Sequence, residues 1–264
     1  MLMAVDIGNT NIAIGFLEGG HITGTYRLTT QQDRTADEYG ILITQLLSLS
    51  GYGRQDVEDV VVASVVPEVM HSFRASLVRF LDIEPMVVGP GIKTGMNIRL
   101  DDPRSLGADC LCDCVGAYFV YGGPVLVADF GTATTFNYVD GQAGIRSGLI
   151  TVGIRSGAAV LAGKTAQLPQ VEITKPGTIL ATGTRTAMQA GLYYNFLGGL
   201  ERIVDQFRKE IGGDFKVVAT GGLGSIFSDE TDRIDIYDPD LMFKGMALIR
   251  ERNREDRPGG LRTA

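Results

Sequence analysis

One pattern occurs twice in this chain, and its duplication restricts the possible folds more than any other feature. The stretch "AVDIGNTNIAIGFLEG" begins at residue 4, and "VADFGTATTFNYVDGQ" begins at residue 127. Each reads as an apolar strand that ends in Asp-x-Gly, followed by a small polar turn and a second strand. Asp6 and Asp129 are 123 residues apart in a chain of 264 residues. The repeat therefore predicts two domains of the same fold.

A second repeat supports this division. "VVASVV" at residues 61–66 and "VVATGG" at residues 217–222 both read as buried strands late in their half. Two repeats in matched halves favour duplicated domains that face each other across a cleft. The expected division is an N-terminal domain, a C-terminal domain and a frayed, mixed-charge tail, over residues 1–118, 119–250 and 251–264.

The first half has the order expected of a mixed α/β domain. Periodicity and turn residues predict three consecutive strands and then alternating helices and strands. The strands are expected at residues 1–10, 11–19, 21–29, 59–66 and 85–89, and the helices at residues 35–50 and 67–81. Pro67 is suited to the first turn of the second helix.

Composition limits the class of protein and its partners. The chain has 44% hydrophobic residues, which is enough to fill two cores, and its formal net charge is −7. An acidic chain is not expected to bind nucleic acid over a broad surface. No apolar run reaches the length of a membrane span, and the opening "MLMAVD" lacks the features of a secretory signal. We therefore expect a cytoplasmic protein without membrane or nucleic-acid partners, whose ligands are small molecules.

The polar turns suggest phosphate binding. Backbone N–H groups that converge in a turn can hold an anion, and Gly8 lets the chain approach a phosphate closely. Asn9, Thr10 and Asn11 add donors, and Asp6 is suited to bind the magnesium that accompanies a nucleotide. An ordinary polar hairpin explains either copy alone. The pair favours two hairpins that hold one triphosphate.

The three cysteines are close together in "GADCLCDCVGAY", at positions 110, 112 and 114. On a helix, Cys110 and Cys114 share one face and Cys112 points away, so one metal ion cannot be bound by all three. Small packing residues in a reducing compartment are the favoured interpretation, and a metal site is the alternative.

Seven short motifs together resemble the type III pantothenate kinases of the acetate and sugar kinase, heat-shock chaperone and actin superfamily. They are "DIGNTN", "ASVVPEV", "GADC", "DFGTATT", "KTAQLPQVE", "GTRTAMQAG" and "ATGG". The resemblance implies an α/β actin-like ATPase fold with two duplicated ribonuclease-H-like domains and a nucleotide cleft between them. It implies ATP-dependent phosphorylation of pantothenate to 4'-phosphopantothenate, the first step of coenzyme A biosynthesis. It also implies a homodimer that needs magnesium and a monovalent cation, potassium or ammonium.

The resemblance further assigns roles to individual positions. Asp109 matches the catalytic base, and Asp129 matches a carboxylate that binds potassium. The ATP-binding positions are Asp6, Ile7, Gly8, Asn9, Thr10, Asn11, Ile12, Ala13 and Thr132. The substrate-binding positions are Gly107, Ala108, Asp109, Cys110 and Thr184.

Phosphoryl transfer needs one carboxylate to receive the proton of the attacking hydroxyl group. "SLGADC" places Asp109 at a loop-to-helix junction, where a side chain can face a cleft. A helix N-cap is the alternative role for an aspartate at such a position.

Two positions depart from the family pattern. Cys110 stands where the family has arginine, and Leu100 stands where it usually has tyrosine. A thiol offers one weak donor and no charge, so affinity for pantothenate is expected to be lower unless Arg99 or Arg104 supplies the missing charge. The departures keep two alternatives open: a weak or inactive family member that acts as a regulatory accessory factor, and a kinase for another small hydroxy substrate.

Overall fold

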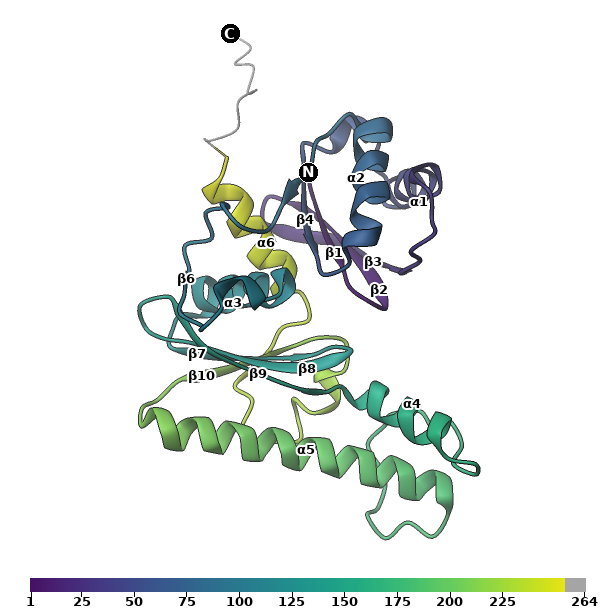
Figure 1. The fold of residues 1–264 in the computed structure, drawn as a ribbon, viewed down its shortest axis with the longest axis vertical. Coiled ribbons are helices and arrows are strands. Elements are labelled where there is room, and N and C mark those ends of the chain that lie inside the picture. The colour runs from purple at the N-terminus through teal and green to yellow at the C-terminus, as the bar shows by residue number, and fades with distance from the viewer. Residues whose placement is uncertain (255–264) are drawn as a thin grey trace. The chain divides into compact units, whose positions relative to one another are not determined.

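A computed structural model of the chain describes residues 1–254 and divides them into two compact units (Figure 1). Unit 1 comprises residues 1–96, 101–116 and those from Asp240 onward, and unit 2 comprises residues 97–100 and 117–239. The expected division kept residues 119–250 together, whereas the last helix packs within unit 1. Of the expected tail, residues 255–264 lie outside the described part of the chain. No helix in the described part is both long and apolar enough to cross a membrane.

Unit 1 contains a five-stranded sheet in the order β3-β2-β1-β4-β5. Its strands are β1 (Leu2–Ile7), β2 (Asn11–Glu18), β3 (His21–Thr29), β4 (Asp59–Ser64) and β5 (Met86–Val87). β1, β2 and β3 form an antiparallel meander, and β4 and β5 continue the sheet in parallel with β1. Its helical elements are α1 (Ala36–Leu49), η1 (Arg54–Asp56), α2 (Pro67–Leu81), η2 (Pro103–Ser105), the start of α3 (Ala108–Tyr121) and α6 (Leu241–Arg252).

Local sequence explains where the first two helices begin. The Thr35 side chain accepts a hydrogen bond from the Glu38 backbone, and the Glu38 carboxylate accepts one from the Thr35 backbone, which forms a capping box at the start of α1. Pro67 occupies the first turn of α2, as expected. The two helices lie side by side on one face of the sheet (Figure 1), where the rings of Tyr39 and Phe73 pack edge to face at 5.2 Å.

Unit 2 contains a six-stranded sheet in the order β11-β10-β7-β8-β9-β6. Its strands are β6 (Asn97–Ile98), β7 (Val125–Phe130), β8 (Ala133–Val139), β9 (Gly144–Val152), β10 (Lys216–Thr220) and β11 (Ile236–Tyr237). Its helical elements are the end of α3, α4 (Ile154–Lys164), α5 (Thr184–Ile211) and η3 (Gly224–Ile226). The long α5 runs along one face of this sheet (Figure 1) and contributes Leu192, Tyr193 and Val204 to the core of the unit.

The two sheets have the same topology. When β7, β8, β9, β10 and β11 are matched with β1 to β5 in order, each unit has the strand order 3-2-1-4-5. The first pair of strands is antiparallel in both units, and the fourth strand is parallel to the first. The internal repeat therefore corresponds to a duplicated fold, as predicted. The short β6 adds a strand beside β9 that has no counterpart in unit 1.

Within unit 1, α3 and α6 cross with their backbones in close contact. A Cβ atom on Gly245 would overlap the Cys112 carbonyl oxygen, and a Cβ on Gly116 would lie 2.5 Å from the Leu241 oxygen. Glycine is therefore required where these two helices meet. Since α3 carries Asp109 in its first turn, this crossing determines where the predicted catalytic base lies.

Further contacts fix α6 on the sheet of unit 1. The Arg250 guanidinium donates to Asp59 in β4 across 3.1 Å, and both side chains are largely buried. Gly15 in β2 leaves room for the Phe243 ring, which a Cβ atom would meet at 2.9 Å. These contacts explain why the last helix belongs to unit 1 even though its sequence follows unit 2.

Candidate functional site

The first Asp-x-Gly hairpin connects β1 and β2. Met3, Val5 and Ile7 point into the core beneath α1 and α2, so the alternation of a strand places Asp6 on the opposite face of the sheet. The turn is closed by a hydrogen bond from the Gly8 N–H to the Asn11 carbonyl at 3.0 Å.

The residue after β3 ties this turn to the sheet. The Thr30 N–H donates to the Thr10 carbonyl at 3.0 Å, and the Thr30 hydroxyl donates to the Gly8 carbonyl at 2.7 Å. The side chains of Asn9, Thr10 and Asn11 are exposed. The turn thus combines a fixed backbone with accessible polar side chains, as phosphate binding requires.

Gly8 lies between a carbonyl and a carboxylate. A Cβ atom at this position would be 3.1 Å from the Asn11 oxygen and 3.8 Å from Asp6 Oδ2. Of the other predicted ATP-binding residues, Ile7 and Ile12 have fully buried side chains, so only their backbone groups are available to a ligand. Ala13 is half-buried.

Asp109 is the second residue of α3, which confirms the predicted loop-to-helix junction. Its Oδ1 accepts a hydrogen bond from the Cys110 N–H at 2.8 Å, and Gly107 precedes the helix, with its carbonyl accepting from Leu111 at 3.0 Å. Asp109 therefore lies inside the first turn and is not the N-cap residue. A Cβ atom on Gly107 would overlap Asp109 Oδ1, so glycine here makes room for the carboxylate.

Val65 links the start of α3 to the end of β1 in unit 1, because a Cβ atom on Gly107 would lie 3.7 Å from Val65 Cγ1 and the Val65 N–H donates to the Ile7 carbonyl at 3.1 Å. Burial raises the pKa of Cys112 well above its usual value, and the nearby carboxylates of Asp113, Asp6 and Asp109 raise it further. Burial also raises the pKa of Cys114. Both cysteines are fully buried neutral thiols, as the packing interpretation predicts. Among the described residues, no cluster of three or more histidine, cysteine or acidic side chains is arranged to hold a metal ion.

The second hairpin places Asp129 in the equivalent position. Leu126, Ala128 and Phe130 point into the core with α5, so Asp129 lies on the opposite face of its sheet, and its side chain is partly exposed. A Cβ atom on Gly131 would be 3.3 Å from Asp129 Oδ2 and 3.2 Å from the Ala133 carbonyl oxygen. The glycine two residues after each aspartate therefore has the same role in both hairpins.

Gly221 confines Asp129 from the other side. It follows β10 with a φ of +85°, and a Cβ atom there would overlap Asp129 Oδ1 and lie 2.7 Å from the Phe130 nitrogen. In the structure, Gly221 lets the backbone approach the aspartate.

Thr132 is exposed at the tip of the second hairpin, against the start of α4. Its carbonyl accepts hydrogen bonds from the Gly153 N–H at 3.2 Å and from the Ser156 hydroxyl at 2.7 Å. A Cβ atom on Gly153 would overlap this carbonyl. The sequence analysis did not identify Gly153 and Ser156. Both lie at the start of α4, and the internal repeat has no equivalent of this helix in the first half of the chain.

Two pockets lie within unit 2. The polar pocket, of about 450 Å³, is lined by α4, by the segment before α5 and by the residues after β10: Arg155, Ala158, Ala159, Gln170, Val171, Glu172, Ile173, Gly222, Leu223, Ser225 and Ile226. Since Gly153 and Ser156 at the start of α4 donate to the Thr132 carbonyl, and Gly222 follows Gly221, this pocket adjoins the second hairpin. Its size is suited to a small ligand.

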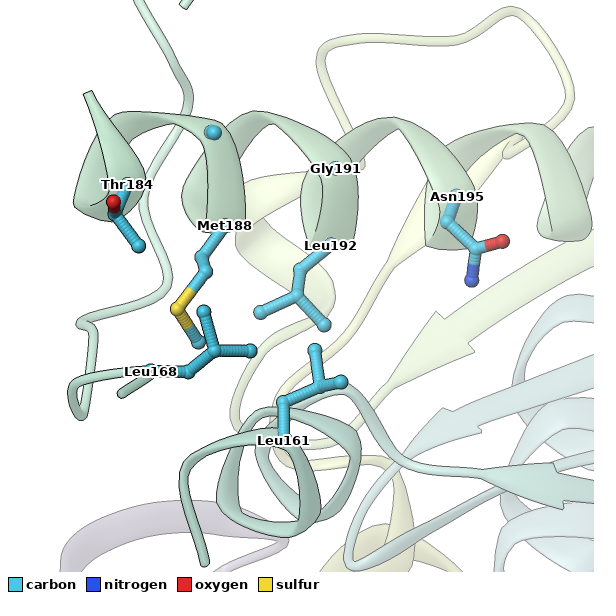
Figure 2. Close-up of a pocket in the computed structure, with 8 residues that line it drawn as sticks. Leu161, Leu168, Thr184, Met188, Gly191, Leu192 and Asn195 are labelled. Atoms are coloured by element: carbon cyan, nitrogen blue, oxygen red, sulfur yellow. The ribbon is translucent and has the colours of Figure 1, made fainter. Parts of the chain in front are cut away.

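The apolar pocket, of about 640 Å³, lies between α4 and the first half of α5 (Figure 2). Figure 2 shows Met188 and Leu192 projecting from α5 toward Leu161 of α4, with Thr184 at the edge of the pocket. Thr184 is exposed and begins α5. Thr184 belongs to unit 2, whereas the other predicted substrate-binding residues, Gly107, Ala108, Asp109 and Cys110, belong to unit 1.

The departures from the family pattern also have definite positions. Cys110 is partly exposed beside Asp109. Arg99 lies 4.0 Å from Asp140, which follows β8 at the end opposite Thr132. Seven residues of strand separate those ends, a length of roughly 20 Å. Within unit 2, Arg99 is therefore remote from the second hairpin.

Comparisons with known proteins agree on one family. A family model described as type III pantothenate kinase matches residues 2–206. A type III pantothenate kinase of Bifidobacterium longum subsp. infantis is 71% identical over 253 residues, which cover 96% of this chain and 99% of that protein. Another, of Agathobacter rectalis, is 47% identical over 257 residues, which cover 97% of this chain and 99% of that protein.

Solved structures share the fold at low sequence identity. A proposed 2-dehydro-3-deoxygalactonokinase from Sinorhizobium meliloti has a TM-score of 0.61 at 11% identity and is covered completely, as is this chain. A proposed Baf family transcriptional activator from Campylobacter jejuni has a TM-score of 0.59 at 18% identity, with 96% of this chain and 99% of that chain covered. These likenesses concern the fold alone. The matched family model and the similar full-length relatives show that this chain belongs to the type III pantothenate kinase family.

Proposed function

We propose which residues this chain uses, as a type III pantothenate kinase, to transfer the γ-phosphoryl group of ATP to pantothenate. The product is 4'-phosphopantothenate, and the reaction is the first step of coenzyme A biosynthesis. One observation carries the proposal: Gly107 at the start of α3 lies against Val65, whose N–H donates to the Ile7 carbonyl next to Asp6, so Asp109 and the first hairpin are close within unit 1. A phosphate-binding turn and a candidate base thus occur in one region.

The first hairpin binds the phosphates of ATP. The turn from Gly8 to Asn11 offers backbone and side-chain donors, and Asp6 offers a carboxylate on the same face as Gly8. A single carboxylate fits magnesium, which usually keeps several waters and binds substrate phosphates as well. When bound, the ion neutralises charge on the transferred group.

The second hairpin contributes Thr132 as a nucleotide contact and Asp129 as the ligand of potassium or ammonium. Asp129 supplies a partly exposed carboxylate, and the Ala133 carbonyl lies near the same glycine, so hard oxygen atoms suited to a monovalent cation are present. The nucleoside occupies the polar pocket, which adjoins this hairpin and is of suitable size.

Asp109 acts as the general base. Its carboxylate receives the proton of the pantothenate hydroxyl group as that oxygen attacks phosphorus, while Gly107, Ala108, Cys110 and Thr184 contact the substrate. Cys110 cannot pair with a carboxylate as arginine does, and Arg99 lies beside Asp140. We therefore expect a raised KM for pantothenate.

A homodimer in the cytoplasm completes the proposal. Large apolar side chains are exposed on β9, α4 and α5, including Ile150, Val160 and Tyr194, and the apolar pocket lies between the same two helices. Such surfaces are typical of contacts between subunits. Sedimentation should then give about twice the 28.3 kDa mass of one chain, and a monomer at micromolar concentration would contradict this assignment.

The replacement Asp109→Asn tests the base. It keeps the shape of the side chain but cannot accept the proton, so kcat should fall by about 10²- to 10⁴-fold. ATP binding, measured by calorimetry, should be nearly unchanged. Asp101→Asn, an exposed aspartate outside the proposed site, is the matched control. Full activity of Asp109→Asn would remove this residue from the role of base.

The altered substrate segment favours one further candidate, a regulatory accessory factor without kinase activity. Cys110 and Leu100 replace the polar side chains that the family pattern has at these positions. An assay of ADP release from ATP, with and without pantothenate, distinguishes the kinase from the accessory factor. Stimulation by pantothenate supports the kinase, whereas ATP binding without turnover supports the accessory factor.

A further inference from the structure

Two sequence motifs in which the proposed chemistry gives a role to Thr184 alone meet within unit 2. "KTAQLPQVE" begins at Lys164, and "GTRTAMQAG" begins at Gly183, at the start of α5. The segment between α4 and α5 includes residues 170–175, here called the strap. Side chains from the second motif reach the backbone of the first.

The strap is held by two side chains of α5. Arg185 Nη1 donates to the Gln170 carbonyl at 2.9 Å, and Gln189 Nε2 donates to the Glu172 carbonyl at 3.0 Å and is 3.4 Å from Thr174 Oγ1. Residues 185 and 189 are one helical turn apart and therefore share a face of α5. Carbonyl groups two residues apart in an extended chain point to the same side. The spacing of the donors on α5 thus matches the spacing of the acceptors on the strap.

Other contacts fix the remaining sides of the strap. Val171 and Ile173, at alternate positions of the strap, pack against the core cluster of unit 2. At its end, Lys175 Nζ pairs with Glu230 Oε1 at 2.7 Å. The strap is therefore anchored by its backbone, by its apolar side chains and by an ion pair.

The strap forms one wall of the polar pocket. Four consecutive residues, from Gln170 to Ile173, line this pocket together with α4 and the residues after β10. Two of these four residues carry the carbonyl groups that Arg185 and Gln189 hold. The width of the pocket consequently depends on hydrogen bonds made outside it.

We propose that Arg185 and Gln189 are positioning residues for the nucleotide: they fix the strap against α5 and thereby shape the wall that contacts the nucleoside. The proposal rests on the assignment of the nucleoside to the polar pocket. It gives the two motifs a shared role that is independent of the transferred phosphoryl group.

The replacement Gln189→Glu is the central test. The carboxylate has the shape of the amide but no N–H to donate, and it places negative charge against two oxygen acceptors. The KM for ATP should rise by about three- to tenfold, while kcat and the KM for pantothenate stay within about twofold. Binding of ADP, measured by calorimetry without pantothenate, should weaken by the same factor. Gln206→Glu makes the same change on α5 outside the strap and should leave all three constants unaltered.

The arginine provides a rescue experiment. Arg185→Met should weaken ADP binding, and Arg185→Lys should restore part of the loss because lysine can donate to the same carbonyl. Arg202→Met, on the exposed part of α5, is the matched control. Equal effects on both substrates, or a lower kcat together with a lower melting temperature, would show a merely structural role and contradict the proposal.

One more variant distinguishes failure of this inference from failure of the nucleoside assignment on which it rests. Ala159→Phe fills the polar pocket from α4 without touching the strap anchors. If it leaves ADP binding unchanged, the nucleoside assignment and the inference both fail. If it weakens binding whereas Gln189→Glu and Arg185→Met do not, the inference alone fails. Lack of pantothenate phosphorylation by the unaltered protein would overturn the proposed reaction, and ADP binding would still decide the role of the strap.

Discussion

The two Asp-x-Gly hairpins share a position in the fold but differ in their surroundings. Each lies between the first two strands of a 3-2-1-4-5 sheet, with its aspartate on the face away from the apolar core. Between the last paired residues of each hairpin, the first turn contains residues 8–11 and the second contains residues 131–133. Asp6 consequently pairs with Ala13, whereas Asp129 pairs with Thr135. Duplication preserved the sheet, and the turns then diverged.

The neighbours of the two aspartates differ more than the turns do. Asp6 lies near the start of α3, which brings a second carboxylate, Asp109, to the same region. Asp129 lies between Gly131 and Gly221. In the proposed assignment, unit 1 supplies the base and unit 2 supplies a confined carboxylate.

The largest effect should come from breaking the confinement of Asp129. Gly221→Ala adds a Cβ atom 2.7 Å from the Phe130 nitrogen, at a φ of +85° that alanine rarely adopts. Strain and overpacking together should lower the free energy of unfolding by about 2 to 5 kcal/mol. Urea denaturation measures this change.

A second glycine provides the control for that experiment. Gly213 also lies in unit 2, but a Cβ atom there would have no neighbour within 4 Å. Gly213→Ala should change the free energy of unfolding by less than about 0.5 kcal/mol. Equal stability of the Gly221→Ala and Gly213→Ala proteins would mean that the tight approach to Asp129 is not maintained in solution.

A smaller but still large effect is expected at the first hairpin. Asp6→Asn removes the carboxylate assigned to magnesium and leaves the turn hydrogen bonds of Gly8 and Thr30 in place. We expect kcat to fall by about 100-fold, because loss of one electrostatic contact to a transferring group has this scale. Steady-state assays over a range of magnesium concentrations measure it. Activity and magnesium dependence like those of the unaltered protein would assign Asp6 a structural role.

The sequence predicted the elements of the fold better than their register and grouping. Pro67 and the periodicity after it predicted α2 with its observed bounds, and the repeat predicted equivalent strands. The one-residue difference between the turns was not predictable, because both turns begin with glycine and consist of small residues. The return of α6 to unit 1 depends on the contact between Gly116 and Gly245, which has no local signal.

Prediction of the candidate site from the sequence was limited in the same way, because contacts between distant segments have no local signal. Asp6, Gly8 and Asp129 were identified from the repeated strand ends, and Asp109 was identified from the family resemblance together with its place at a helix start. The roles of Gly153, Gly221 and Gln189 depend on what lies opposite them in space. Arg99 was a candidate to replace the missing arginine because it is close to Cys110 in sequence, and within unit 2 it pairs with Asp140 at 4.0 Å.

The smallest effect should distinguish the two aspartates most sharply. Asp129→Asn leaves the first hairpin and Asp109 unaltered, so turnover at saturating potassium should fall by only about tenfold, the scale of one lost contact to a charged group. The potassium concentration that gives half-maximal activity should rise, while the magnesium dependence stays the same. Asp6→Asn should show the reverse pattern. Potassium titrations of both variants make the comparison, and identical curves for both would mean that the two hairpins do not divide the cations between them.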